Sequence, residues 1–306
     1  MKLRKWGIGF LVLNFLTVAS AAPEASKLVH LFDYDAHQSL DIHDKTLKDF
    51  GCGVIHDITY VSPSGGPISA YLIVPKGNGP FAAIVFGHWG NGTRGEFIPE
   101  AKAYACAGVI SVLPDYRWER PRPWYSEVDD FAHPDSDRKT RIATIVEMRR
   151  AIDLLLSRTD VDPNRVAYVG HSFGAQWGAI LTAVDLRLKA AVLMAGAAEE
   201  ADMLLRSDNP RLAELRTSLP KGQLDAYLNT LADLNAINYI RLAQPVPLLL
   251  QFANFEQYFD RASMERYAAA ATEPKTVLFY DSAHDLNDPQ AFKDRADWLA
   301  KRLALR

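Results

Sequence analysis

The sequence predicts an α/β fold, with a mostly parallel central sheet, helices on both faces and a small helical cap insertion. Short apolar runs rich in β-branched residues, such as 81–86, 109–113 and 166–169, are typical of buried parallel strands. Amphipathic segments lie between such runs, and the clearest is 135–157, whose apolar residues repeat at helical spacing. A chain of 306 residues with 48% hydrophobic content can form one sizeable globular domain.

The N-terminus differs in kind from the rest of the chain. Three basic residues precede an apolar run over 6–18 and then the small residues 19–22, which is the layout of a cleavable secretory signal. The run is shorter than the roughly 20 residues that span a bilayer. We therefore predict a signal peptide at 1–21, no stable membrane anchor after its cleavage, and a secreted or periplasmic protein. The alternatives are an uncleaved anchor or a buried helix.

The mature chain begins with a polar, irregular stretch at 22–53, which we interpret as a leader segment lying over the domain. The main domain then spans 54–306. Its first two strands, 54–61 and 68–75, are separated by a turn rich in serine, glycine and proline, and they predict a hairpin at the sheet edge. A cap-like insertion of two or three helices is expected at about 197–244.

The most informative motif is Gly170-His171-Ser172-Phe173-Gly174, which lies between the strand 166–169 and the helical segment 173–186. In a Gly-x-Ser-x-Gly elbow, a strained turn lifts the serine hydroxyl above the sheet, and glycines allow the helix and strand to approach closely. Ser172 is therefore the candidate nucleophile. The alternative is an ordinary strand-to-helix turn that carries a serine.

The stretch Asp162-Pro163-Asn164-Arg165-Val166 leads into this elbow, and together they resemble the α/β-hydrolase superfamily. Within it, the likeness is to the dienelactone-hydrolase-like and prolyl-oligopeptidase-like branches. Dienelactone hydrolases proper use a cysteine nucleophile, whereas this chain has Ser172, so their lactone substrate does not carry over. The resemblance implies the hydrolase fold and a triad in the chain order serine, acid, histidine.

The predicted base is His284, because it is the one histidine after the elbow that lies beyond the turn of Ser172 itself. It follows the last predicted strand. The acid is less determined: Glu256 follows the penultimate strand at the family's acid position, and Asp260 and Glu200 are the alternatives.

The glycine-rich loop after the strand 81–86 begins His88-Trp89-Gly90. The resemblance implies that this loop supplies one backbone N–H of an oxyanion hole and that Phe173 supplies the other. We assign the loop donor to Trp89, with Gly90 as the alternative, and expect His88 to orient the loop. The alternative is a glycine-rich turn in which Trp89 only packs over the sheet.

The segment after the strand 109–113 is rich in proline, aromatic residues and arginine. It leaves the carboxyl end of a parallel strand, where ligands bind in open sheets. Its side chains could stack on a ring and hold an anionic group, or they could form a packed surface loop. The candidate substrate-binding residues are Tyr116, Arg117, Trp118 and Trp124.

Composition excludes several other functions. A net charge of −3 with mixed signs gives no nucleic-acid footprint, and no cysteine, histidine or carboxylate cluster has metal-ligand spacing. We expect no cofactor and a small-molecule ester as the partner. The sequence leaves open the oligomeric state and whether Cys52 and Cys106 form a disulfide or remain buried thiols.

We therefore predict a secreted serine hydrolase that cleaves a carboxylic ester through an acyl-enzyme on Ser172. The alternatives are a serine exopeptidase or amidase of the prolyl-oligopeptidase-like branch and a non-catalytic binding protein on a hydrolase scaffold. Intact Ser172 and His284 argue against the binding protein.

Overall fold

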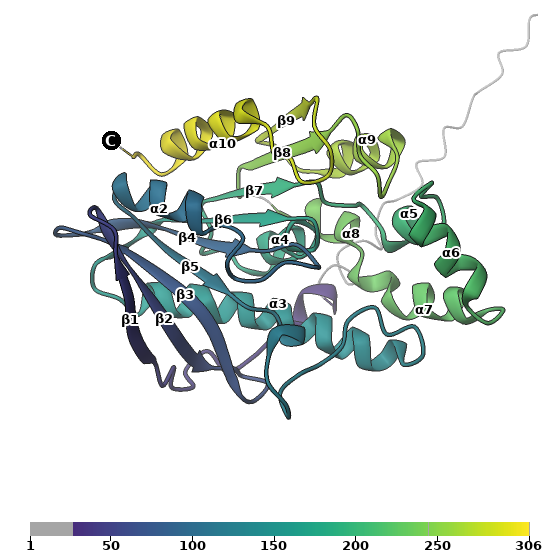
Figure 1. Ribbon diagram of the computed structural model, residues 1–306, viewed down its shortest axis with the longest axis horizontal. Coiled ribbons are helices and arrows are strands. Elements are labelled where there is room, and N and C mark those ends of the chain that lie inside the picture. The colour runs from purple at the N-terminus through teal and green to yellow at the C-terminus, as the bar shows by residue number, and fades with distance from the viewer. Residues whose placement is uncertain (1–26, 244, 306) are drawn as a thin grey trace, which may run out of the picture.

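The central sheet has nine strands within residues 27–243 and 245–305, the part of the chain that the computed structural model describes. They are β1 (His43–Asp49), β2 (Gly53–Val61), β3 (Pro67–Pro75), β4 (Phe81–Gly87), β5 (Val109–Pro114), β6 (Val161–His171), β7 (Ala190–Met194), β8 (Leu248–Ala253) and β9 (Lys275–Tyr280). Their order is β1-β2-β3-β5-β4-β6-β7-β8-β9 (Figure 1). β1, β2, β3 and β5 pair antiparallel, and all pairs from β5 to β9 are parallel, which confirms the predicted sheet.

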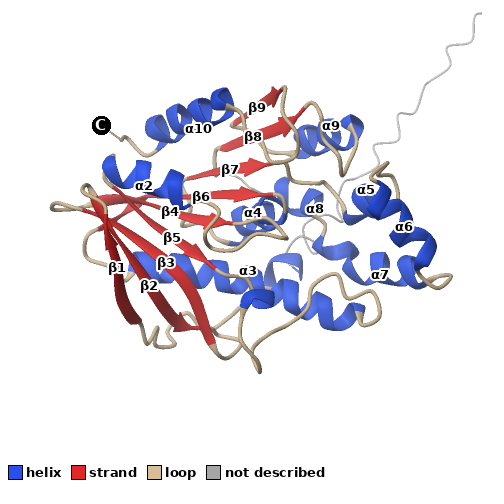
Figure 2. Ribbon diagram, viewed as in Figure 1, coloured by secondary structure: helices blue, strands red, loops and turns tan. Residues whose placement is uncertain are grey.

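Helices cover both faces of the sheet (Figure 2). One face packs α2 (Ile98–Cys106) and α10 (Pro289–Arg302), and the other packs α3 (Pro134–Leu156), α4 (Phe173–Val184), α8 (Ala236–Ile240) and α9 (Arg261–Ala270). Strand β4 divides its side chains between the two cores because successive residues of a strand point to opposite faces. Ala83 and Val85 join the core under α3 and α4, while Ile84 and Phe86 join the core under α2 and α10.

The predicted leader segment at 22–53 is wrong in its second half, because β1 belongs to the sheet. This strand pairs antiparallel with β2, with His43 opposite Thr59. The β2–β3 hairpin is confirmed, but β1 takes the edge position expected for it. All residues of β1 are exposed, so the strand has no apolar alternation by which a sequence pattern could reveal it.

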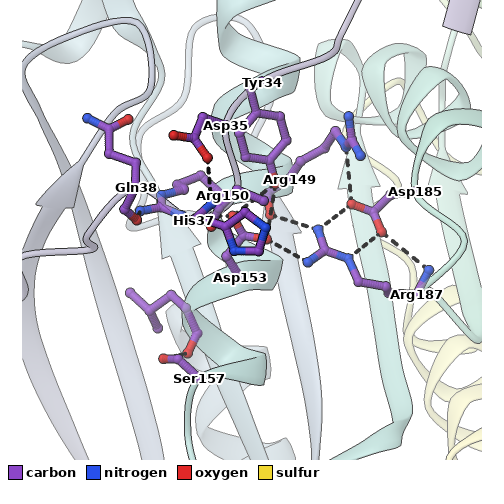
Figure 3. Close-up of polar contacts among 12 residues, drawn as sticks. Tyr34, Asp35, His37, Gln38, Arg149, Arg150, Asp153, Ser157, Asp185 and Arg187 are labelled. Carbon is purple, nitrogen blue, oxygen red and sulfur yellow. Dashed lines mark hydrogen bonds and ion pairs between the residues drawn. The ribbon is translucent and has the colours of Figure 1, made fainter. Parts of the chain in front are cut away.

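The described residues before β1 pack against α3 rather than lying loosely on the surface. The Phe32 side chain is fully buried, and Arg149 of α3 donates a hydrogen bond from Nη1 to the Phe32 carbonyl at 2.8 Å. The Tyr34 hydroxyl donates to Asp153 at 2.9 Å, and Arg187 contacts the same carboxylate at 2.5 Å (Figure 3). This ionic network ties the N-terminal segment to α3 and to the loop after α4.

A disulfide joins Cys52 to Cys106, which settles the question that the sequence left open. Cys52 directly precedes β2 and Cys106 ends α2, so the bond links the antiparallel edge of the sheet to a helix on its face. The two cysteines are 54 residues apart, and a loop of that length corresponds to about 4 kcal/mol of stabilisation in the chain-entropy model.

The insertion after β7 contains α5 (Glu200–Leu204), α6 (Pro210–Ser218), α7 (Gln223–Leu231) and α8 within its described residues, more helices than the two or three predicted. In Figure 1, α5, α6 and α7 lie beyond the arrowheads of the parallel strands. The predicted signal peptide at 1–21 lies outside the described residues. Among the helices that are described, none has the length and apolar character needed to cross a membrane.

Candidate active site

Ser172 lies at a sharp turn between β6 and α4. Its φ of 55° and ψ of −113° place a non-glycine residue in a strained backbone conformation. Flanking glycines are required by close backbone contacts: a Cβ on Gly170 would lie 2.3 Å from the Gly174 carbonyl oxygen, and one on Gly174 would lie 2.1 Å from that of Gly87. The elbow predicted from the sequence is therefore present, and the serine lies at the start of α4.

Three side chains from different loops form a hydrogen-bonded row. The Ser172 hydroxyl lies 2.8 Å from His284 Nε2, and His284 Nδ1 lies 2.8 and 2.9 Å from the two carboxylate oxygens of Glu256. Because an ionised carboxylate only accepts, Nδ1 carries the proton and Nε2 is left to accept from the serine. The side chains of His284 and Glu256 are 9% and 2% exposed, so bulk water screens this contact little.

Glu256 is the acid that reaches His284. Its carboxylate also accepts backbone N–H groups of Gln257 at 2.8 Å and Tyr258 at 3.0 Å, which fixes its orientation.

The other two candidate acids have different partners. Asp260 caps α9 by accepting the Ser263 N–H at 2.8 Å, and Glu200 pairs with Arg141 at 2.6 Å. Neither contacts His284 in the structure.

The glycine-rich loop presents its backbone differently from the expectation. The N–H of Trp89 donates to Glu96 Oε2 at 2.8 Å, so it is not a free donor as predicted. The neighbouring Gly90 lines the cavity at Ser172, and its N–H has no hydrogen-bond partner among the described residues. The N–H of Phe173 lies in the first turn of α4, where backbone donors have no acceptor within the helix.

His88 orients this loop, in agreement with the prediction. Its Nδ1 donates to the Trp89 carbonyl at 2.7 Å, and its Nε2 accepts the Tyr116 N–H at 3.4 Å. Burial lowers the pKa of His88 to about 4, so the imidazole is neutral near neutral pH. The side chain therefore bridges the loops after β4 and β5 and makes no hydrogen bond to Ser172.

A cavity of about 390 Å³ opens at Ser172. Aromatic side chains form much of its wall, and its charged rim groups are acidic. The lining residues are Trp89, Gly90, Asn91, Trp118, Tyr125, Glu127, Val128, Asp129, Ser172, Phe173, Met203, Leu212, Tyr258 and His284. This lining contains no lysine or arginine, because Arg117 and Arg120 pair with Glu147 instead. Of the two alternatives for the loop after β5, its arginines therefore fit the packed loop and not the anion-binding wall.

Trp118 alone of the four predicted substrate-binding residues lines this cavity. Tyr116 is buried and packs on the His88 ring with centroids 3.9 Å apart. Arg117 is buried in an ion pair with Glu147, at 2.7 Å.

Trp124 lies elsewhere too, over the turn between β2 and β3. Its ring is so close to Gly66 that a Cβ there would lie 2.4 Å from it. Three residues that were not predicted line the cavity only one to five positions further along the same loop: Tyr125, Glu127 and Asp129. Their acidic and aromatic character is visible in the sequence, but the direction in which the loop turns is not.

Known structures resemble this one over nearly the whole chain. An acetyl xylan esterase from Paenibacillus sp. R4 matches with a TM-score of 0.75 at 19% identity, covering 92% of this chain and 93% of that chain. The chain has the α/β-hydrolase fold. Acetyl xylan esterase 1 from Thermoanaerobacterium sp. JW/SL YS485 matches at 0.75 and 15% identity, covering 92% of both chains. A glucuronoyl esterase from Solibacter usitatus matches at 0.64 and 16% identity, covering 91% of both.

No family model matches the chain, and no curated protein matches it. Within the described α/β-hydrolase domain, no group of three or more histidine, cysteine, aspartate or glutamate side chains could hold a metal ion.

Proposed function

We propose that this protein is a serine hydrolase that cleaves a carboxylic ester through an acyl-enzyme. The observation that carries the proposal is the 2.8 Å contact between Ser172 Oγ and His284 Nε2, continued from Nδ1 to Glu256. Acyl transfer to serine requires this arrangement, in which a base contacts the nucleophile and an acid orients the base. Structural neighbours named as esterases support ester hydrolysis as the activity.

The proposed reaction has two halves. Ser172 Oγ attacks the ester carbonyl while His284 Nε2 takes its proton, and the imidazolium then protonates the departing alcohol. Water next attacks the acyl-enzyme, gives its proton to the same nitrogen, and releases the acid. Glu256 holds the imidazole in the required tautomer and stabilises its charged form in both halves.

The developing oxyanion needs donors that are free in the resting enzyme. Phe173 N–H meets that condition, and Gly90 is the second donor we propose, in place of Trp89, whose N–H is engaged with Glu96. Each such donor contributes about 3 to 4 kcal/mol to transition-state stabilisation in hydrolases, because it points at charge that forms during attack.

The proposed substrate is a small neutral or cationic ester. Trp118 and Tyr125 offer aromatic faces to the cavity, and Glu127 gives it negative charge, whereas Asp129 is paired with Arg141 at 2.8 Å. Glu127 has no ion-pair or hydrogen-bond partner among the described residues, so its charge is not neutralised by a neighbour. An anionic acyl or alcohol group would be repelled there.

We also propose that the protein is exported. The basic, apolar and small-residue layout over 1–22 supports a cleaved signal, and the Cys52–Cys106 disulfide fits an oxidising compartment. N-terminal sequencing of the protein recovered from an expressing host tests this. A mature chain that begins near Ala22 or Pro23 supports export, whereas a retained Met1 in a cytoplasmic fraction contradicts it.

The activity is tested with a short-chain neutral aryl ester. We expect turnover by the wild type and a loss of at least about 1,000-fold in kcat for Ser172→Ala, because the nucleophile is removed. Ser218→Ala is the matched control, since Ser218 is exposed on α6. A folded wild type without turnover on esters, but with turnover on aryl amides, would favour the amidase alternative.

A further inference from the structure

Glu96 and His171 form a contact beside the catalytic row that the proposed reaction does not use. Glu96 Oε1 lies 2.7 Å from His171 Nδ1, and their side chains are 21% and 5% exposed. The other ring nitrogen, Nε2, lies 2.8 Å from the backbone carbonyl of His284. The second carboxylate oxygen of Glu96 accepts the Trp89 N–H at 2.8 Å.

The two partners of His171 determine its protonation. The His284 carbonyl oxygen can only accept, so His171 Nε2 carries a proton. An ionised Glu96 also only accepts, so a second proton lies between Glu96 and His171 Nδ1. The short 2.7 Å contact is that of a charge-assisted hydrogen bond, in which the ring holds this proton and the carboxylate accepts it. The Trp89 N–H further favours the carboxylate form of Glu96.

This pair connects three segments that are far apart in the sequence. Glu96 lies 75 residues before His171, and His171 lies 113 residues before His284. Hydrogen bonds of 2.7 to 2.8 Å therefore link the loop of Trp89, the elbow that carries Ser172 and the loop that carries His284. Two titratable side chains of the described residues contact the His171 ring. They are Glu96, at Nδ1, and His284, whose ring centroid lies 5.3 Å from that of His171.

We propose that Glu96 and His171 form a charged pair that positions the oxyanion loop and His284 around Ser172. The proposal rests on the proposed function, because its consequence is for the ester hydrolysis assigned to Ser172. Both are positioning residues: neither faces the serine hydroxyl, and each acts on a backbone group of a catalytic loop. Displacing a catalytic group by about 1 Å can cost about 100-fold in rate, so a link between two such loops bears directly on kcat.

Two substitutions of Glu96 separate the effect of its hydrogen bonds from the effect of its negative charge. In Glu96→Gln, the amide oxygen can accept the Trp89 N–H and the amide NH₂ can donate to a neutral His171 Nδ1, which keeps every contact without the charge. Glu96→Ala removes both contacts. We expect at least a tenfold loss of kcat with KM changed less than about threefold in Glu96→Ala, and a kcat within about threefold of wild type in Glu96→Gln. Glu214→Ala, on the exposed face of α6, is the control.

The charge itself is read by nitrogen-15 NMR of histidine-labelled protein near pH 8, with the His171 signals identified by their loss in His171→Asn. We expect two protonated ring nitrogens on His171 in the wild type and one in Glu96→Gln. A singly protonated His171 in the wild type, or equal kcat losses in Glu96→Ala and Glu96→Gln, would overturn the proposal, as would an unchanged kcat in Glu96→Ala. The NMR measurement needs no turnover, so an inactive wild type would contradict the proposed function without deciding the state of the pair.

Discussion

Glu256 faces His284 across 2.8 Å, from loops that follow the adjacent parallel strands β8 and β9. The two residues are 28 positions apart, but parallel pairing brings the carboxyl ends of their strands to one edge of the sheet. Both carboxylate oxygens are within 2.9 Å of Nδ1, so the glutamate side chain reaches the base directly. The contact to His284 Nδ1 is therefore made by a glutamate, which in the proposed reaction takes the place of the usual aspartate.

Replacing Glu256 with glutamine removes the charge and keeps the shape. We expect kcat for a neutral aryl ester to fall by about 1,000- to 10,000-fold, because the amide can donate to Nδ1 and so favours the wrong tautomer of His284. Steady-state kinetics at saturating ester measures this loss.

Asp260→Asn is the matched control for that substitution. Asp260 is the alternative acid on the same loop, and asparagine caps a helix as well as aspartate does, so α9 is preserved. Full activity in Asp260→Asn is expected; a severe loss there with little effect in Glu256→Gln would reverse the assignment of the acid.

The acidic rim of the cavity predicts discrimination by substrate charge. An ester bearing a carboxylate should show lower kcat/KM than its neutral isostere at low ionic strength, by about threefold to tenfold, because the unpaired Glu127 carboxylate repels it. Competition assays at pH 8 in low and high salt measure the ratio, which should approach one at about 1 M salt, where the screening length is about 3 Å.

In Glu127→Gln, the penalty on the anionic ester should shrink while kcat/KM for the neutral ester stays the same. Arg117 and Arg120 would be the relevant residues if the loop after β5 bound anions. Preferential turnover of the anionic ester by the wild type would therefore contradict the acidic-rim assignment.

The buried Glu147 neutralises two arginines at once, Arg117 at 2.7 Å and Arg120 at 2.5 Å. Glu147→Gln leaves both guanidinium groups buried without a countercharge, which typically costs about 3 to 5 kcal/mol. Urea unfolding should show a loss of that order in the free energy of unfolding. Glu265→Gln, on the exposed face of α9, serves as the control, and equal stability of the two variants would contradict the role of the pair.

His88 predicts a pH-dependent difference in stability. Burial lowers its pKa from 6.5 to about 4, so between these pH values the unfolded chain binds a proton that the folded chain does not. The stability contributed by His88 is fully present above pH 6.5 and is lost as the pH falls toward 4. Relative to His88→Asn, the wild type should lose about 3 kcal/mol over this range.

Denaturant unfolding of both proteins at several pH values measures that difference. Asp115 has the opposite sign, since burial raises its pKa to about 6, but it is present in both proteins and cancels in the comparison. Parallel stability curves for wild type and His88→Asn would contradict the buried neutral histidine.

The sequence predicts the parts of this protein that depend on local pattern. The core strands have continuous apolar runs, and the elbow at Ser172 requires glycines at fixed positions, so both can be predicted from the sequence. The order of the triad then narrows the base to His284. The structure brings that histidine to Ser172 and resolves the choice of contact partner in favour of Glu256.

The parts that the sequence did not predict depend on long-range pairing. Strand β1 is exposed on both faces and mostly polar, so it is recognised only by its pairing with β2. Arg117 and Trp118 are neighbours in the sequence, yet Arg117 forms an ion pair with Glu147 and Trp118 lines the cavity. The engagement of the Trp89 N–H by Glu96 likewise depends on how a loop folds back over seven residues.

The most direct test of the central claim is covalent labelling of the mature protein with a fluorophosphonate, followed by peptide mass spectrometry. We expect one adduct, on the peptide that carries Ser172. No adduct is expected in Ser172→Ala, or when an excess of an ester substrate competes with the probe. Glu256→Gln should label much more slowly, because the base is no longer oriented. An adduct on another serine, or no adduct in a folded wild type, would contradict the assignment of Ser172 as the nucleophile.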